Sequence, residues 1–168
     1  LGTLKPLEHA PIKPEGDSAI NWVIDLPKGQ EHLCPRVTGR SFGQLTNGAS
    51  PRWMKQRLNA VGQRPISALV DITNYIMIDL GRPLHAYDAD KIDGNQLTIR
   101  LAKDGEEFNS LNEKTYKLDA SMITIADAHG ADDLAGIMGG ERTGISDATT
   151  TMFLEIAIFD MISVATTG

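Results

Sequence analysis

The sequence predicts an α+β fold in which layers of mixed or antiparallel β-sheet pack against helices. Strand-like segments outnumber helical ones and rarely alternate with them, an order that is typical of α+β proteins. The 168 residues are 41% hydrophobic and 23% charged, which suits one globular domain with a sizeable core. We place this domain at residues 20–168. Residues 1–19 hold three prolines and little apolar periodicity, so we interpret them as a linker or N-terminal extension.

The chain is organised around residues 64–88, which read RPISALVDITNYIMIDLGRPLHAYD. Pro65 suits the first turn of a helix, where its missing N–H is not needed. Gly81 suits the position just after a helix, where a positive φ is common. We therefore predict a helix over residues 66–80. Its apolar residues recur at steps of three and four, and further isoleucines lie outside that stripe, so the helix is expected to be buried on more than one side.

Two polar residues, Thr73 and Asn74, lie inside this apolar stripe. A buried polar group without a hydrogen-bond partner costs about 1–3 kcal/mol, so both side chains need partners. Two alternatives remain open: a hydrogen-bonded pair within the core, or a pair that faces a cavity.

The remaining elements are predicted from alternation and from turn residues. Strands are expected at residues 20–26, 36–42, 96–101, 122–126 and 151–158, with a loose hairpin over residues 108–118. Ser50 followed by Pro51 predicts a helix that has Ser50 as its N-cap and ends at Gly62. No element is assigned to residues 127–140, which are acidic and then glycine-rich, and none is expected at the end of the chain.

Charge, cysteine content and hydropathy argue against several classes of protein. The net charge of −6 argues against a self-sufficient nucleic-acid binder, because Lys and Arg carry most of the affinity for phosphates. The single cysteine cannot form an internal disulfide, so an intracellular, cytoplasmic setting is expected. No apolar run approaches the ~20 residues of a membrane span, and no charged-then-apolar leader opens the sequence.

The sequence carries no signature of a metal site or of covalent catalysis. The four histidines are far apart, no pair of cysteines exists, and neither a nucleophile elbow nor a phosphate-binding loop is present. Cys34 is interpreted as a small buried hydrophobe rather than a nucleophile, because no partner base is indicated. Hydrolysis of an activated ester by a positioned water remains compatible with such a sequence.

A few residues have both a structural and a functional interpretation. His85 follows the predicted helix and is either a structural hydrogen-bonding residue or a catalytic one. Alternation in residues 151–158 places Phe153, Glu155 and Ala157 on one face, where Glu155 points to solvent or into a pocket. Ala135 and Gly136 form either a tight turn or a close pocket wall.

Several motifs, taken in order, closely resemble the B3/B4 module of bacterial phenylalanyl-tRNA synthetase β subunits. The resemblance covers roughly residues 35–160, and six matches in order and at fitting spacing are a specific signal. They are Cys34-Pro35-Arg36, Arg64-Pro65-Ile66, the Val70–Tyr75 motif VDITNY, the Pro83–Asp88 motif PLHAYD, the Leu134–Gly140 motif LAGIMGG, and Phe153-Leu154-Glu155.

The resemblance implies a site. In that family a histidine and a neighbouring Thr-Asn pair lie beside the scissile ester, and these motifs fall on His85, Thr73 and Asn74. The glutamate that reads a tyrosine hydroxyl falls on Glu155. Three further residues would complete the substrate site: Ala135 and Gly136 would line the amino-acid pocket and Pro83 would shape its entrance.

The resemblance also implies a function and partners. The expected activity is hydrolysis of tyrosine from mischarged tRNA(Phe), without a metal or cofactor in this segment. ATP and Mg²⁺ are implied for the full synthetase, as are an α subunit and other β-subunit domains in an α2β2 assembly. The chain opens on Leu1 and is therefore interpreted as excised from a longer β subunit. The alternative is a non-catalytic structural or interaction module of the same subunit.

Two charged features bear on this resemblance. Asp132 and Asp133 stand just before Ala135, where more neutral residues are expected, and they make the shape and charge of that loop differ from the family pattern. The densest basic cluster is a solvated helix face by default, with a contact to the tRNA backbone as the alternative; it consists of Arg52, Lys55, Arg57 and Arg64.

Overall fold

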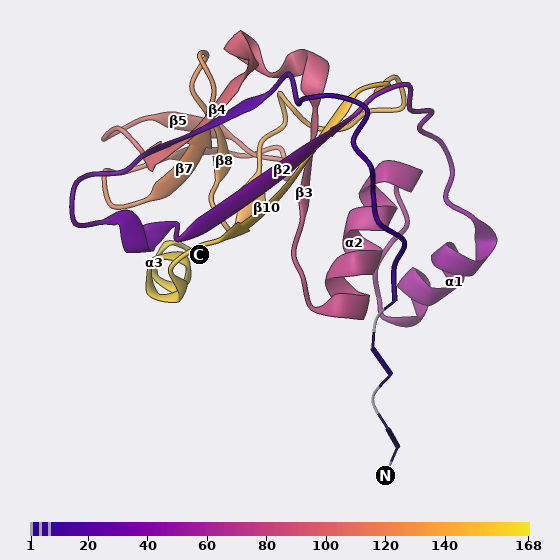
Figure 1. The fold of residues 1–168 in the computed structure, drawn as a ribbon. Helices are drawn as coiled ribbons and strands as arrows, with labels where there is room; N and C mark the ends of the chain where they lie inside the picture. Colours follow the sequence, from indigo (N-terminus) through magenta and orange to yellow (C-terminus); the bar gives the residue numbers. More distant parts are fainter. Residues whose placement is uncertain (1, 4, 7) are drawn as a thin grey trace.

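The computed structural model describes residues 2, 3, 5, 6 and 8–168. Figure 1 shows the elements in space. The helices are α1 (Arg52–Ala60), α2 (Ala68–Leu80) and α3 (Met161–Thr167). The strands are β1 (Asn21–Asp25), β2 (Arg36–Phe42), β3 (His85–Asp88), β4 (Gln96–Leu101), β5 (Glu107–Asn109), β6 (Thr115–Lys117), β7 (Ile123–Ala126), β8 (Ala131–Leu134), β9 (Met138–Gly139) and β10 (Met152–Ile158). Three 3-10 turns lie at Glu31–Leu33, Ala89–Lys91 and Asp93–Asn95.

The strands form two main sheets and one hairpin. The larger sheet has the order β1-β4-β7-β8-β9, in which only β1 and β4 run parallel, and the smaller sheet is the antiparallel β2-β10-β3. The hairpin β5-β6 stands beside the larger sheet. In Figure 1 the smaller sheet lies between the larger one and the helices α1 and α2. The predicted α+β fold, with mixed and antiparallel sheets layered against helices, is confirmed.

Each face of the smaller sheet packs against a different layer. Tyr87 and Phe153 project toward the larger sheet and are fully buried with Leu97 and Ile99 of β4. Ala86 and Met152 project the other way and contact Leu69 of α2. Burying one such apolar side chain contributes roughly 1.5–3 kcal/mol, so these two interfaces hold the three layers together.

The strand predictions are confirmed with small shifts of their ends. The expected strands at residues 36–42 and 96–101 agree with β2 and β4, and those at 20–26, 122–126 and 151–158 contain β1, β7 and β10. The hairpin expected at residues 108–118 forms as β5 and β6 around a turn. Period-two alternation is a local signal, and β4 carries it in its own sequence QLTIRL.

Helix α2 begins two residues later than predicted. Its N-cap is Ser67 in an extended conformation, and Ile66 lies outside the helix with an exposed side chain. The free N–H of Leu69 is satisfied by the Oδ1 atom of Asn47, at 3.2 Å, rather than by a neighbour in sequence. A capping group that comes from 22 residues away leaves no signal in the helix's own sequence.

Helix α1 also begins later than predicted. Pro51, not Ser50, is the N-cap, and the Ser50 hydroxyl donates a hydrogen bond to the buried carboxylate of Asp71. The end is as expected, because Val61 is the C-cap and Gly62 follows with φ of +81°. Asp71 therefore links the start of one helix to the first turn of the other.

Among the described residues, one helix and three strands were missed: α3, β3, β8 and β9. The chain does have a terminal element, α3, whose N-cap Asp160 accepts a hydrogen bond from the backbone of Ser163 at 2.9 Å. The short strand β3 occupies the motif that follows the central helix. Strand β8 covers part of the acidic segment and buries Asp132 and Asp133, which pair with groups distant in sequence. No helix within the described ranges combines the length and the apolar character needed to cross a bilayer.

Candidate functional site

The site is centred on two residues that face each other across neighbouring strands. Glu155 on β10 is the direct cross-strand partner of His85 on β3. Tyr87 and Phe153, two residues further along the same strands, face the larger sheet, so alternation directs His85 and Glu155 to that side too. The predicted histidine and the predicted glutamate are thus brought together between the two sheets.

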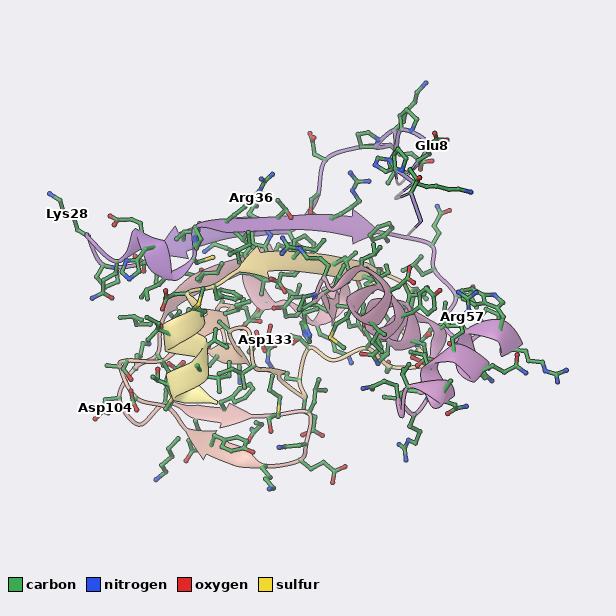
Figure 2. The ribbon with its side chains drawn as sticks, turned by 90° about the horizontal axis from the view of Figure 1, so that it is seen from below. Glu8, Lys28, Arg36, Arg57, Asp104 and Asp133 are labelled. Carbon is green, nitrogen blue, oxygen red and sulfur yellow. The ribbon has the colours of Figure 1, made fainter. Side chains whose placement is uncertain are left out.

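A third polar residue joins them from the larger sheet. The Oδ1 atom of Asp133 on β8 lies 3.5 Å from the Nε2 atom of His85 and accepts a hydrogen bond from the backbone N–H of Gly140 at 3.1 Å. Its Oδ2 atom accepts a hydrogen bond from the Tyr87 hydroxyl. Figure 2 places Asp133 in the interior of the molecule, beneath β10. Sequence reasoning noted this aspartate only as a departure from the family pattern.

Five acidic side chains are buried among the described residues, and four of them have hydrogen-bond or ionic partners: Asp71, Asp88, Asp132 and Asp133. Glu155, with 6% of its surface exposed, accepts no hydrogen bond from any of the described groups. The Glu155 oxygens are not among the fully enclosed polar atoms that lack a partner, so this largely buried carboxyl still reaches accessible space and is available to a ligand.

Burial dominates the protonation of Glu155. It raises the pKa of this carboxyl from 4.5 to about 8, the nearby charge of Asp133 acts in the same direction, and the charge of Arg82 opposes both. The side chain is therefore mostly a neutral carboxylic acid at pH 7, able both to donate and to accept a hydrogen bond. Arg82, an exposed residue in the loop before β3, supplies this compensating charge.

The other predicted pocket residues lie around this centre. Ala135 is buried in the core between the sheets, two residues after Asp133, and continues the hydrogen-bonded ladder to β7. Gly136 has φ of +73°, and a Cβ there would lie 3.0 Å from Val164 of α3 and 3.2 Å from Phe159. Pro83 is exposed, two residues before His85. Gly136 thus faces the C-terminal helix in this structure.

Thr73 and Asn74 belong to a different layer. They lie on α2, which packs on the face of the smaller sheet opposite to Glu155. The Thr73 hydroxyl donates to the carbonyl of Val70 at 2.7 Å, so the hydrogen-bonded alternative holds for this residue. No hydrogen bond among the described residues joins Thr73 or Asn74 to His85.

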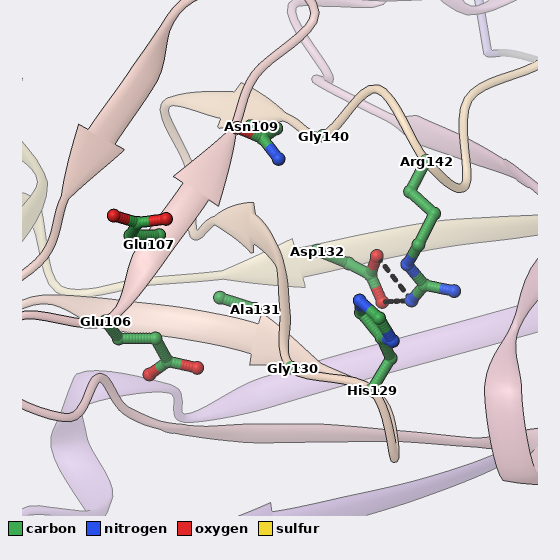
Figure 3. Close-up of a pocket in the computed structure, with 9 residues that line it drawn as sticks. All are labelled: Glu106, Glu107, Asn109, His129, Gly130, Ala131, Asp132, Gly140 and Arg142. Atoms are coloured by element: carbon green, nitrogen blue, oxygen red, sulfur yellow. Dashed lines mark hydrogen bonds and ion pairs between the residues drawn. The ribbon is translucent and has the colours of Figure 1, made fainter.

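The surface hollows lie elsewhere. One of about 190 Å³ is polar, and Figure 3 shows the residues around it: Glu106, Glu107, Asn109, His129, Gly130, Ala131, Asp132, Gly140 and Arg142. Another, of about 300 Å³, is mostly apolar and lies between α1 and α2, lined by Arg57, Leu58, Ala60, Val61, Tyr75, Ile78 and Asp79. Neither of these hollows is lined by His85 or Glu155.

The polar hollow is organised by one arginine. The Arg142 guanidinium contacts Asp132 at 2.6 Å and also pairs with Asp127. Burial, helped by the charge of Asp127, raises the pKa of Asp132 to about 7, although Arg142 acts in the opposite direction. Asp132 and Asp133 therefore point to opposite sides of β8, one toward the hollow and one toward His85.

Cys34 behaves as the sequence indicated. It is 2% exposed and belongs to the main core, and burial raises the pKa of its thiol to about 11. A thiol of this kind is a poor nucleophile at neutral pH. Throughout the part of the chain that the structure describes, no group of three or more potential ligand side chains is arranged to hold a metal ion.

Comparison with known proteins agrees with this fold. A family model described as the B3/4 domain matches residues 33–168. The solved N-terminal fragment of the phenylalanyl-tRNA synthetase β subunit from Pyrococcus horikoshii has a similar fold, with a TM-score of 0.59 over 89% of this chain and 47% of that one, at 12% sequence identity.

Curated relatives are more similar in sequence. Over all 168 residues the chain is 49% identical to the phenylalanine–tRNA ligase β subunit of Paramagnetospirillum magneticum and 46% identical to that of Brucella abortus. It spans 21% of the length of each of these relatives. The family model covers most of the chain, the relatives match it from end to end, and the resemblance noted in the sequence is confirmed: the chain belongs to the B3/4 domain family, in the form found in phenylalanine–tRNA ligase β subunits.

Proposed function

We propose that this domain removes tyrosine from mischarged tRNA(Phe) by hydrolysis, and that Glu155 reads the tyrosine hydroxyl. The observation that carries the proposal is the Glu155 carboxyl, buried beside His85 and without a hydrogen-bond partner among the described residues. A polar ligand group supplied by the substrate would satisfy it.

The chemistry of amino-acid selection supports a second, hydroxyl-reading site. A hydrophobic pocket rejects an analogue that merely adds a hydroxyl only about 100-fold, whereas a site that must hydrogen-bond a hydroxyl rejects the analogue that lacks it far more strongly. A phenylalanine side chain leaves the Glu155 carboxyl unpaired, so correctly charged tRNA is spared. A tyrosine hydroxyl forms a hydrogen bond with the Glu155 carboxyl, so tRNA that carries tyrosine is accepted.

The reaction needs only water as a co-reactant. Water adds to the ester carbonyl, and the bond from that carbon to the ribose oxygen breaks. The ribose oxygen takes up a proton and becomes a hydroxyl, and free tyrosine is released. We assign His85 to orienting the water and the terminal ribose, and Ala135, Pro83 and the turn at Gly136 to shaping the amino-acid pocket. Thr73 and Asn74, expected beside the ester, lie on the opposite face of the smaller sheet from His85 and receive no role in this step. ATP and Mg²⁺ serve amino-acid activation elsewhere in the ligase, together with its α subunit.

Charge distribution supports a tRNA partner for one segment of the chain. Between Glu31 and Asp71 the sequence contains no acidic residue, although the chain as a whole has a net charge of −6. Six basic residues fall in this interval: Arg36, Arg40, Arg52, Lys55, Arg57 and Arg64. Figure 2 shows Arg36 on β2 pointing outward, whereas the guanidinium of Arg57 on α1 lies over the rings of Trp53 and Tyr75. Such a segment can meet a phosphate backbone, while neighbouring parts of a longer protein supply further affinity.

The test is the ratio of Tyr-tRNA(Phe) to Phe-tRNA(Phe) hydrolysis by the full-length ligase that carries this domain. A hydrogen bond between the tyrosine hydroxyl and a neutral carboxyl is worth about 0.5–1.5 kcal/mol, so Glu155→Ala should lower kcat/KM for Tyr-tRNA(Phe) roughly twofold to tenfold. Glu155→Gln, which keeps the shape and can still hydrogen-bond, should lower it less. The control is Glu107→Gln, an exposed glutamate on β5. An unchanged ratio in both Glu155 variants contradicts the proposal.

A non-catalytic module is the second candidate, and one observation favours it. His85 and Glu155 lie between packed sheets, and neither surface hollow described above reaches them. If the wild-type ligase leaves Tyr-tRNA(Phe) intact while it charges phenylalanine normally, this domain serves a structural or docking role.

A further inference from the structure

One ring nitrogen of His85 is enclosed and the other is not. The Nε2 atom is buried without a hydrogen-bond partner among the described residues, and the nearest charged atom is the Oδ1 of Asp133 at 3.5 Å. The side chain as a whole remains 24% exposed, and Nδ1 is not among the enclosed polar atoms. The ring therefore presents one nitrogen to an aspartate and the other toward accessible space.

Packing fixes the ring in this orientation. Gly139 lies against it so closely that a Cβ at that position would be 2.3 Å from the His85 Cε1 atom. On another side the edge of the ring meets Tyr87, with ring centroids 4.5 Å apart and planes at 81°. Because the His85 ring is held between β9 and its own strand β3, it cannot easily flip over and exchange the positions of Nδ1 and Nε2.

Asp133 is held just as firmly. One of its oxygens accepts from the Gly140 backbone and the other from the Tyr87 hydroxyl, and the side chain is buried. Tyr87 itself is fully buried, and burial raises the pKa of its hydroxyl well above the ordinary value, so it remains a donor. These two donors leave Asp133 as an acceptor facing His85.

We propose that Asp133 is a positioning residue that holds neutral His85 in its Nε2–H tautomer, so that Nδ1 is the acceptor nitrogen on the accessible side. A lone pair on the enclosed Nε2 would face the lone pairs of a carboxylate, whereas an N–H there faces an acceptor. Neutral imidazole carries one proton, so a donor at Nε2 makes Nδ1 the acceptor.

This inference deepens the proposed function, because it rests on His85 acting beside the ester. A histidine that orients the hydrolytic water needs an acceptor nitrogen on the side where the water lies. Catalytic hydrogen bonds are often long before substrate binds, so the 3.5 Å separation from Asp133 suits a contact that shortens in the complex. Holding the correct tautomer is the role that the buried aspartate plays in serine proteases, where its replacement by asparagine leaves the geometry intact and gives the wrong tautomer.

The first experiment does not depend on activity. The chain is labelled with ¹⁵N-histidine, and the four histidines are assigned with His85→Gln as the reference. The neutral His85 ring should show a protonated Nε2 and an unprotonated Nδ1. In Asp133→Asn the amide can donate to Nε2, so the protonated nitrogen should shift toward Nδ1. The matched control is Asp132→Asn, which neutralises the adjacent buried acid on the opposite side of β8 and should leave the His85 tautomer unchanged.

The second experiment measures hydrolysis of Tyr-tRNA(Phe) by the full-length ligase. Asp133→Asn should lower kcat roughly tenfold to a hundredfold with little change in KM, and it should change the rate less than about twofold in a His85→Ala background. A predominant Nδ1–H tautomer in the wild-type chain overturns the inference, as does an equal loss of rate in both backgrounds. An inactive wild-type ligase with an intact Nε2–H tautomer instead refutes the proposed function alone.

Discussion

Replacing Glu155 by glutamine should make the chain more stable, and the gain should grow with pH. The pKa of this carboxyl is raised from 4.5 to about 8 by burial, so the folded chain holds a proton that the unfolded chain releases. Between these two values the native state binds more protons than the unfolded state, and stability therefore falls as pH rises. Glutamine keeps the shape of the side chain and cannot ionise.

The size of the effect follows from the two pKa values. Each pH unit between 4.5 and about 8 lowers the free energy of unfolding by about 1.4 kcal/mol. At pH 7 the ionisable side chain therefore destabilises the fold by about 3 kcal/mol relative to glutamine. Near pH 4 both side chains are neutral and the difference should vanish. For a chain of this length about 1 kcal/mol shifts Tm by about 2–4 °C, so the expected gain at pH 7 is about 6–12 °C.

Urea and thermal unfolding of the 168-residue chain at pH 4, 5, 6 and 7 provide the measurement. The exposed Glu107→Gln variant should unfold like the wild type at every pH. The reasoning would be refuted if the difference in the free energy of unfolding between Glu155→Gln and the wild type were the same at every pH, or if the variant were the less stable of the two at pH 7. Either result would show that burial does not hinder ionisation of the native carboxyl.

Three further predictions follow from the structure and the sequence. His85→Ala should slow Tyr-tRNA(Phe) hydrolysis and leave phenylalanine charging by the full ligase nearly unchanged, whereas an equal loss of both would mark the residue as structural. The isolated chain, with its net charge of −6, should bind tRNA no more tightly than a Kd of about 1 μM at physiological salt, and nanomolar binding in a filter or fluorescence titration would contradict this. Cys34, buried with the pKa of its thiol at about 11, should resist iodoacetamide in the native chain at pH 8 and react rapidly in urea.

The elements predicted from the sequence are those whose signal is local. Strand β4 alternates within its own six residues, and the glycine after α2 adopts φ of +63° at the end that was expected. The helix starts were placed wrongly because their partners are distant. Asn47 satisfies the first turn of α2 and Asp71 accepts from Ser50, contacts that only the folded chain creates.

The site was predicted only through the resemblance to a family. Periodicity assigned Glu155 to one face of a strand but could not show whether that face is buried or exposed to solvent. The larger sheet buries it, and the strands of that sheet come mostly from residues between β3 and β10. The cross-strand register that sets His85 opposite Glu155 is likewise a property of the assembled sheet. Asp133 carried no usable signal, since a pair of aspartates beside small residues usually indicates a solvated loop.

The acidic residues around the site differ in what their burial achieves. Asp132 is balanced by Arg142, and Asp133 receives two hydrogen bonds, so both contribute to holding β8 and β9 in place. Glu155 accepts no hydrogen bond from the residues that the structure describes, and its ionisation opposes folding at neutral pH. Functional sites commonly cost stability, so a destabilising buried carboxyl fits the role proposed for Glu155. In this domain Glu155, whose ionisation destabilises the fold, lies opposite His85 on the neighbouring strand. Asp133, which is held by two hydrogen bonds, faces the same histidine. The destabilising carboxyl and the firmly held one therefore meet at His85, between the two sheets.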